Sequence, residues 1–330
     1  MNQFSKTVLK IQETKEELAA SGLTKVADGV FRTKIIFVGA YFVDTPDGWV
    51  LIDTGLPMSD GKIRRAAENH YGANSKPSAI ILTHGHFDHA GAALALAEQW
   101  NISIYAHRLE MPYLTGKSDY PPQDPTMGGA IAQMARFFPR GGYDFGSRVH
   151  QIPESGRIAE MPGWKILHTP GHTAGHISLW RESDKTLLAG DALATMNLDS
   201  WTSQITEKRE FCNPPAPFTT DWQSARRSVE LLADLEPNQV GAGHGQPMTG
   251  ADTARRLKEF ACNFAPPRKG RYVNNPAIAD ESGVIAVPPP VRDDLKVVAG
   301  AAVVVVGAGF ALTTLINRKR VRRKEPQQND

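Results

Sequence analysis

The sequence predicts a mixed α/β (α+β) domain followed by a C-terminal transmembrane helix. Its 330 residues, 41% hydrophobic and 22% charged, have the composition of a globular chain that can bury a large core. Strand-like and helix-like segments interleave without regular βαβ alternation, which indicates mixed sheets covered by helices. Twenty uncharged residues, 297–316, lie close to the C-terminus. As a helix they would span about 30 Å, the thickness of a bilayer's hydrocarbon core.

The domain begins with two apolar runs, 33–43 and 49–53. Pro46, Asp47 and Gly48 lie between them and favour a turn joining two antiparallel strands. Periodicity and composition predict the remaining elements. These are a helix at 59–71, a strand at 78–83, a helix at 90–100, strands at 101–107, 164–169, 176–182 and 185–191, and helices at 221–235 and 251–262.

Two irregular segments interrupt this pattern, 110–148 and 195–220. The first is rich in Pro, Gly, Tyr and Met and holds a short amphipathic piece at 129–138. A long irregular insertion in a compact domain is typical of a lid or a binding loop, so 110–148 is predicted to be a lid. Aromatic residues of the two segments are candidates for the wall of an apolar pocket, or alternatively close the core over the sheets: Tyr113, Tyr120, Phe137, Phe138 and Trp201.

The remaining segments flank the main domain, which is predicted at 25–265. Residues 1–24 are expected to be a helical extension, 266–296 a linker, 297–316 the transmembrane helix and 317–330 a basic tail. A buried core helix is one alternative for 297–316, but a compact domain has little room for a uniformly apolar helix at its end. A dinucleotide-binding loop at "VVVVGAGFA" is another, but Leu312 stands where Gly or Ala is required.

Composition also limits partners and location. The net charge of +2 argues against nucleic acid as an obligatory partner. Cys212 and Cys262 are the two cysteines of the sequence, which excludes a disulfide framework and fits a reducing compartment. The expected location is a membrane, reached through a single C-terminal span. The domain is expected to be cytoplasmic, although the basic residues after the span favour the opposite orientation.

The stretch "THGHFDHAG" places three histidines and a carboxylate between His84 and His89. Imidazole is a good zinc ligand, and two histidines two positions apart on a turn, such as His84 and His86, can converge on one ion. Asp88 and His89 lie too far round the same turn to reach that ion. They are predicted to contact a second ion or a bound water.

Further ligands are expected at the ends of other strands. Suitable histidines occur in "HTPGHTAGH", 168–176, and in "GAGHGQP", 241–247. Between them an apolar strand ends at Asp191, where a buried carboxylate would need a partner cation because an unpaired buried charge is costly. Among the other histidines, His168 is a candidate to support a ligand and His107 to line the pocket.

Together these pieces resemble the metallo-β-lactamase superfamily. "THGHFDHAG" has the form of its H-x-H-x-D-H motif, "TPGHTAGH" of its next histidine motif, "AGDAL" of its bridging-aspartate motif and "GHG" of its last one, while "VLIDTG" resembles its opening strand motif. The resemblance implies two stacked sheets flanked by helices, a four-layer αββα sandwich with a dinuclear site at the sheet edge. The layout is most similar to the YflN-like bacterial branch.

The resemblance also implies a role for each motif residue. It assigns three ligands to a first ion, three to a second and one to both: His84, His86 and His172; Asp88, His89 and His244; and Asp191. Asp53 would orient a ligand histidine, and His176 would lie behind the ligands. The expected cofactors are two Zn²⁺ ions, with iron or manganese as alternatives.

The implied reaction is hydrolysis by a metal-bound hydroxide. Two divalent ions lower the pKa of a shared water toward about 7 and polarise a carbonyl or phosphoryl oxygen. Asp88 would orient the hydroxide and transfer a proton. The missing export signal disfavours a β-lactamase, and the missing basic arm disfavours an RNA-processing enzyme. A glyoxalase II-like enzyme would carry a substantial C-terminal helical domain, whereas this chain is expected to enter the membrane soon after His244. The prediction is a hydrolase of a small-molecule ester, thioester or lactone.

Two other functions stay open. One is a mononuclear iron dioxygenase acting on persulfides, which shares the implied fold. The other is a membrane-tethered metal-binding or sensor protein without catalysis, which the complete set of ligand residues disfavours. Metal content separates the three, because two zinc ions indicate the hydrolase, one iron the dioxygenase and none the binding protein.

Overall fold

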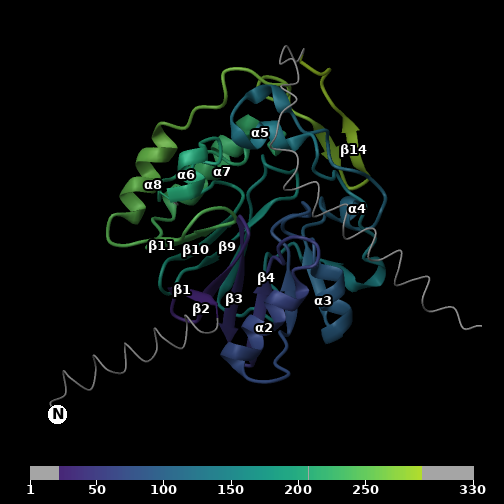
Figure 1. The fold of residues 1–330 in the computed structure, drawn as a ribbon, viewed down its shortest axis with the longest axis vertical. Coiled ribbons are helices and arrows are strands. Elements are labelled where there is room, and N and C mark those ends of the chain that lie inside the picture. Colours follow the sequence, from purple (N-terminus) through teal and green to yellow (C-terminus); the bar gives the residue numbers. More distant parts are fainter. Residues whose placement is uncertain (1–21, 207, 292–330) are drawn as a thin grey trace, which may run out of the picture. The chain divides into compact units, whose positions relative to one another are not determined.

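The computed structural model describes residues 22–206 and 208–291. There the chain forms two β-sheets and a short hairpin, with helices packed on the sheets (Figure 1). The first sheet has seven strands in sequence order: β1 (Leu23–Ala27), β2 (Val30–Ile35), β3 (Val38–Thr45), β4 (Gly48–Ile52), β5 (Ala79–Ile81), β6 (Ser103–Ala106) and β7 (Val149–Gln151). The second has the order β12 (Met248–Thr249), β11 (Gln239–Ala242), β10 (Thr186–Gly190), β9 (Ile177–Arg181) and β8 (Trp164–His168).

The first sheet is antiparallel from β1 to β4 and parallel from β4 to β7. The turn predicted at Pro46 to Gly48 joins β3 and β4, so the antiparallel pair is confirmed. The apolar run 33–43 was predicted as one strand and is divided between β2 and β3. The chain turns at Ile36, which has a φ of 58° and is 72% exposed. The prediction was wrong because the turn forms at Ile36 and Phe37, which normally favour strands, whereas the glycine of the run, Gly39, lies within β3.

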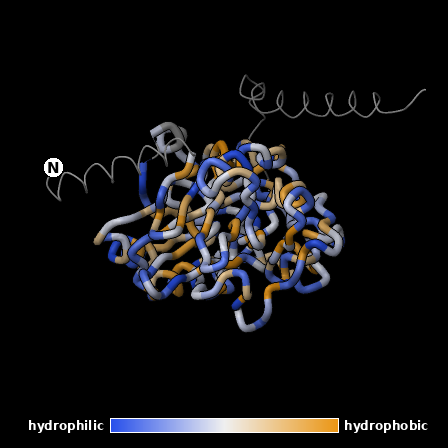
Figure 2. Tube along the Cα trace, turned by 90° about the horizontal axis from the view of Figure 1, so that it is seen from below, coloured by the Kyte–Doolittle hydropathy of each residue, from blue (hydrophilic) through white to orange (hydrophobic). Residues whose placement is uncertain are grey.

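Helices cover the outer face of each sheet (Figure 1). Side chains of β3 alternate accordingly, with Phe42 in the core under the helices and Tyr41 and Val43 in the core between the sheets. Hydrophobic and hydrophilic stretches are intermixed along the described chain (Figure 2). The four helices of these outer layers are α2 (Asp60–Tyr71) and α3 (Ala93–Trp100) on the first sheet, and α7 (Trp222–Asp234) and α8 (Thr253–Cys262) on the second.

The two irregular segments lie against each other. The backbone N–H of Asp124 donates to the Pro217 carbonyl oxygen at 2.8 Å, which joins 110–148 to 195–220. The Asp124 side chain accepts from Thr126 N at 3.0 Å and caps a 3-10 helix. The short helices of the segments are α4 (Met111–Leu114), η1 (Pro125–Met127), α5 (Ala130–Ala135), η2 (Gly146–Arg148), α6 (Trp201–Thr206) and η3 (Ala216–Phe218).

The predicted linker contains a hairpin in its described part. Strands β13 (Ile278–Asp280) and β14 (Gly283–Ala286) pair antiparallel. Before them, the Tyr272 ring is buried and its hydroxyl donates to the Pro122 carbonyl oxygen at 2.6 Å. Residues near 272 therefore pack on the insertion 110–148.

The predicted membrane localisation is contradicted. No helix within 22–206 and 208–291 has the length and apolar character needed to cross a membrane. The longest of them, α7, has 13 residues and measures about 20 Å, which is shorter than the hydrocarbon core of a bilayer. The predicted span 297–316, the basic tail 317–330 and most of the N-terminal extension 1–24 lie outside the described residues.

Candidate metal centre

The structure brings the seven predicted ligand residues together where strands of both sheets end. Their side chains come from the turns after β5, β10 and β11 and from the loop between β8 and β9. They form three overlapping groups, and within each the ligand atoms lie no more than 4.8 Å apart: His84, His86 and His172; His84, His89 and Asp191; and Asp88, His89 and His244.

The turn after β5 is held by backbone contacts that its sequence permits. The N–H groups of His89 and Ala90 both donate to the His86 carbonyl oxygen, at 2.9 and 2.8 Å. Gly91 follows, and a Cβ there would stand 2.3 Å from the Pro57 nitrogen. Only glycine fits this approach, so Gly91 allows the turn to pack against the chain that follows β4.

Asp191 lies at the centre of the cluster. Its Oδ2 is 3.2 Å from Nε2 of His244, 3.4 Å from Nε2 of His89 and 3.5 Å from Nε2 of His172. Burial would raise the pKa of this carboxyl, but His244 and His89 hold that pKa well below its usual range. Asp191 is therefore an anion surrounded by imidazoles from three separate loops.

Hydrogen bonds fix the tautomers of His84 and His89. His89 Nδ1 lies 2.8 Å from Asp53 Oδ2, and because a carboxylate accepts, Nδ1 carries the proton. The Thr83 hydroxyl donates to the same Asp53 oxygen at 2.8 Å, so its oxygen accepts from His84 Nδ1 at 3.1 Å. Both rings consequently turn Nε2 toward the cluster with a free lone pair when they are neutral.

The same logic applies to His172 and His244. The Thr219 hydroxyl donates to the Pro215 carbonyl oxygen at 2.9 Å, so it accepts from His172 Nδ1 at 3.2 Å. His244 Nδ1 donates to the Phe37 carbonyl oxygen at 3.1 Å. Four imidazoles of the cluster thus present Nε2 inward, because each Nδ1 proton is held by an outer acceptor, the arrangement found behind metal-binding histidines.

Three buried polar atoms of the cluster have no hydrogen-bond partner among the described residues: His84 Nε2, His89 Nε2 and Asp191 Oδ1. His172 Nε2, which carries a lone pair, faces His86 Nδ1 at 3.0 Å. Buried acceptors left unsatisfied in this way are costly unless a cation or a proton lies between them. The donor set, imidazole nitrogens with a shared carboxylate, fits divalent metal ions.

The histidines of the cluster divide into two electrostatic classes. Burial holds the pKa values of His84 and His172 well below the usual range and lowers that of His86 to about 3. Burial also acts to lower the pKa values of His89 and His244, but Asp191 and neighbouring carboxylates raise both above the usual value. In the metal-free protein, His89 and His244 therefore stay protonated to a higher pH than the other three histidines do.

His176 supports Asp191 from behind. Its Nε2 accepts a hydrogen bond from the Asp191 backbone N–H at 2.8 Å, and its Nδ1 donates to the Thr169 carbonyl oxygen at 3.1 Å. Burial lowers the pKa of His176 to about 3, so the ring stays neutral. Both nitrogens are occupied by these contacts, so His176 orients the strand end that bears Asp191.

Sequence reasoning missed Glu110, which connects two ligand loops. Its side chain is fully buried, and Oε2 accepts from Gly85 N at 3.0 Å in the turn after β5. Oε1 accepts from Thr173 Oγ1 at 2.7 Å and from Gly175 N at 3.0 Å, both beside His172. The Tyr120 hydroxyl also donates to this carboxyl group. No motif marks Glu110, because its partners are distant in the sequence.

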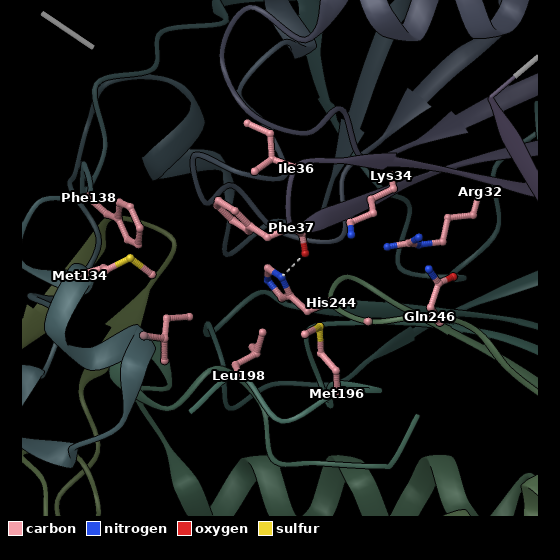
Figure 3. Close-up of a pocket in the computed structure, with 12 residues that line it drawn as sticks. Arg32, Lys34, Ile36, Phe37, Met134, Phe138, Met196, Leu198, His244 and Gln246 are labelled. Atoms are coloured by element: carbon pink, nitrogen blue, oxygen red, sulfur yellow. Dashed lines mark hydrogen bonds between the residues drawn. The ribbon is translucent and has the colours of Figure 1, made fainter. Parts of the chain in front are cut away.

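A cavity of about 270 Å³ opens beside the cluster, with His244 in its wall (Figure 3). A narrower cavity lies over the ligands themselves and shares Phe37, Ile131, Phe138 and His244 with the first. Phe138 and Ile131 belong to the predicted lid 110–148, so part of that segment lines the site. Phe37, on the turn between β2 and β3, was not predicted.

The other aromatic candidates have different positions. Phe137 is 71% exposed and lines neither cavity. Tyr113 and Tyr120 are buried and stacked, with ring centroids 4.0 Å apart, and Tyr120 lies 4.5 Å from the His86 ring. The Trp201 side chain lies outside what the structure describes.

The two other candidate histidines, His107 and His168, stack on each other with centroids 4.2 Å apart. His168 Nε2 lies 2.8 Å from the carbonyl oxygen of Ala174, which belongs to the loop that carries His172. His168 therefore braces that loop, and His107, which was a candidate to line the pocket, stacks on His168 and lines neither cavity.

Comparison with known proteins places this arrangement in a family. The chain is 42% identical over 241 residues to the probable metallo-hydrolase YflN of Bacillus subtilis, covering 72% of this chain and 91% of YflN. It is 30% identical over 116 residues to the hydroxyacylglutathione hydrolase GloC of Haemophilus influenzae, covering 34% of this chain and 49% of GloC.

Among solved structures, the chain matches a metallo-β-lactamase of Cronobacter sakazakii with a HARLDQ motif, with a TM-score of 0.50 and 18% identity. The match covers 73% of this chain and 92% of that one, so the two share the fold. Residues 36–244 match the metallo-beta-lactamase superfamily. This stretch contains all seven clustered residues. The chain therefore belongs to the metallo-β-lactamase superfamily and is a metal-dependent hydrolase.

Proposed function

We propose that this enzyme hydrolyses an ester, thioester or lactone bond of a small molecule at a dinuclear metal centre. The first ion would be held by His84, His86 and His172, the second by Asp88, His89 and His244, and both by Asp191. The observation that carries the proposal is the position of Asp191. Its carboxylate approaches Nε2 of three histidines from three loops within 3.5 Å, as a group shared between two ions would.

The proposed ions are Zn²⁺, since imidazole suits zinc, although the same donors accept iron and manganese. When bound, two divalent ions would lower the pKa of a water molecule toward about 7 and polarise the carbonyl of the substrate. The chain contributes the fixed tautomers described above and the carboxylate of Asp191. These keep Nε2 of each ring directed inward before a metal arrives.

Asp88 is the proposed catalytic residue. It is buried, and its Oδ2 lies 3.5 Å from His244 Nε2. Burial raises the pKa of this carboxyl group in the metal-free protein. In the proposed mechanism Asp88 orients the attacking water and takes its proton on Oδ1.

The adjacent cavity supports a small substrate. Its volume of about 270 Å³ suits an acyl group and not a macromolecule. Phe37 and Phe138 contribute apolar surface to it. The similarity to a hydroxyacylglutathione hydrolase supports an acyl compound as the substrate. Because the similar region covers only 34% of this chain, it does not indicate which leaving group the acyl compound carries.

The test is metal analysis of the full-length protein, followed by assays with p-nitrophenyl esters, thioesters and lactones. Two zinc ions per chain and hydrolysis of one of these classes are expected. One metal ion per chain would contradict the dinuclear assignment. A metal-replete protein that hydrolyses none of the three classes would contradict the proposal.

A further inference from the structure

Arg32 is a buried arginine in the wall of the cavity beside the metal centre. Its side chain is 3% exposed, and its Nε has no hydrogen-bond partner among the described residues. Gly39 leaves it room, because a Cβ at that position would stand 2.4 Å from Arg32 Nε. Arginine stays protonated at all ordinary pH values, so a full positive charge lies at this wall.

The neighbour that Arg32 contacts does not neutralise this charge. Tyr41 lies opposite it in the pairing of β2 with β3. The Tyr41 hydroxyl donates to the Ala242 carbonyl oxygen at 2.6 Å, which requires the neutral phenol. Burial raises the pKa of Tyr41 to about 12, and Arg32 opposes this shift without cancelling it.

The cavity itself has two chemically different ends (Figure 3). Arg32, Lys34 and Gln246 gather at one end, and Met134 and Phe138 lie at the other, with His244 between them. Of the twelve described residues that line the cavity, none is acidic. The walls are otherwise mainly apolar, with Phe37, Met196 and Leu198 near His244.

A buried cation without a counter-ion is unfavourable, and a ligand anion removes that cost. A guanidinium group binds a carboxylate with two parallel hydrogen bonds. The apolar walls require that the rest of the ligand be hydrocarbon.

We propose that Arg32 binds a carboxylate group of the substrate and so selects acyl compounds that carry an acid at the far end of a short apolar chain. The chain lies along Phe37, Met196 and Leu198, and the bond to be cleaved lies beside His244. Arg32 thereby determines specificity and takes no part in the cleavage. This assignment rests on the proposed hydrolase function, which it deepens by naming the substrate class.

The experiment compares two esters that share a five-carbon acyl chain, p-nitrophenyl pentanoate and mono-p-nitrophenyl glutarate. The metal-replete full-length enzyme is expected to have a KM for the glutarate ester about tenfold or more below that for the pentanoate ester. Arg32→Met should raise the KM for the glutarate ester about 10- to 100-fold, to near the KM for the pentanoate ester, so that the preference for the glutarate ester is lost. Arg32→Lys should restore part of the preference. Arg65→Met, which removes an exposed arginine from α2, should behave as wild type.

A binding measurement separates this inference from the hydrolase proposal. Calorimetric titration with pentanoate, whose carboxylate models the charged end, is expected to show binding that Arg32→Met weakens at least about tenfold and Arg65→Met leaves unchanged. If wild type hydrolyses neither ester but binds pentanoate through Arg32, the hydrolase proposal fails and the carboxylate site stands. If Arg32→Met changes neither binding nor the glutarate KM, the site is overturned while hydrolysis stands. Tighter binding of butyl phosphate than of pentanoate would also overturn the carboxylate assignment.

Discussion

Asp53 Oδ2 accepts a hydrogen bond from Nδ1 of His89 at 2.8 Å, and His89 Nε2 then lies 3.4 Å from Asp191. Asp53 has a φ of 57°, a left-handed backbone conformation that aspartate tolerates better than most residues. The other oxygen of this carboxylate accepts from the Thr83 backbone N–H at 2.8 Å. One buried carboxylate thus sets both the start of the turn after β5 and the tautomer of its last histidine.

Asp53→Asn should weaken binding of the second ion about 10- to 100-fold. An amide N–H₂ facing His89 would donate to Nδ1, which would move the imidazole proton to Nε2 and remove the lone pair that the ion needs. Competition with a chelator measures the affinity of each ion. Asp47→Asn, in the exposed turn between β3 and β4, is the matched control and should bind both ions as wild type does.

His86→Ala and Asp88→Asn should separate metal binding from catalysis. His86→Ala removes a nitrogen that lies 3.0 Å from His172 Nε2, so loss of metal and of all hydrolysis is expected. Asp88→Asn keeps an oxygen that can bind the ion but cannot accept the proton, so it should retain at least part of the metal while kcat falls about 10²- to 10⁴-fold. Metal content and kcat are measured on the same preparations. An Asp88→Asn enzyme with full kcat would remove Asp88 from the mechanism.

The two ions should be released at different pH values. Protons compete with an ion for imidazole, and His89 and His244 have raised pKa values whereas that of His86 is lowered to about 3. Lowering the pH from neutrality should therefore protonate His89 and His244 first and release the second ion. Over an intermediate pH range the protein should hold one ion per chain, before it loses both.

Equilibrium dialysis at stepped pH, with metal content measured at each step, tests this order. His244→Gln should show only the step at lower pH, because it removes a ligand of the second ion. Loss of both ions from the wild type in a single step would contradict the two classes of histidine.

Glu110→Gln should destabilise the protein and loosen the ligand loops together. The amide N–H₂ would face donors that now share the carboxylate, from Gly85 on one side or from Thr173 and Gly175 on the other. Each buried donor left without an acceptor costs about 1–3 kcal/mol of unfolding free energy. Chemical denaturation measures the loss, and chelator competition should show weaker binding of the first ion.

Tyr120→Phe and Glu98→Gln are the controls for Glu110. Tyr120→Phe removes one donor to the Glu110 carboxyl group and keeps the ring beside His86, so a smaller loss is expected. Glu98 is exposed on α3, and Glu98→Gln should unfold as wild type does. A Glu110→Gln protein as stable as the Glu98→Gln protein would show that the carboxylate does not join the loops.

Local patterns predicted the parts of the site whose signal lies within one short segment. Four ligand-type side chains between His84 and His89 stand out without any knowledge of the fold. Asp191 was found because an apolar strand that ends in a carboxylate is unusual. The turn at Ile36 was missed because isoleucine and phenylalanine favour strands, and the turn depends on the pairing of β2 with β3.

The sequence by itself determined the mixed α/β class, most of the strands and helices, and which residues are candidate ligands, because these depend on periodicity and on the spacing of ligand-type side chains. Only the tertiary structure decided which nitrogen each histidine turns inward, since the acceptors at Asp53, Phe37 and Thr219 come from elsewhere in the chain. It alone also revealed Glu110 and Arg32. Their roles depend on burial and on contacts between residues far apart in sequence, and a linear pattern does not record either.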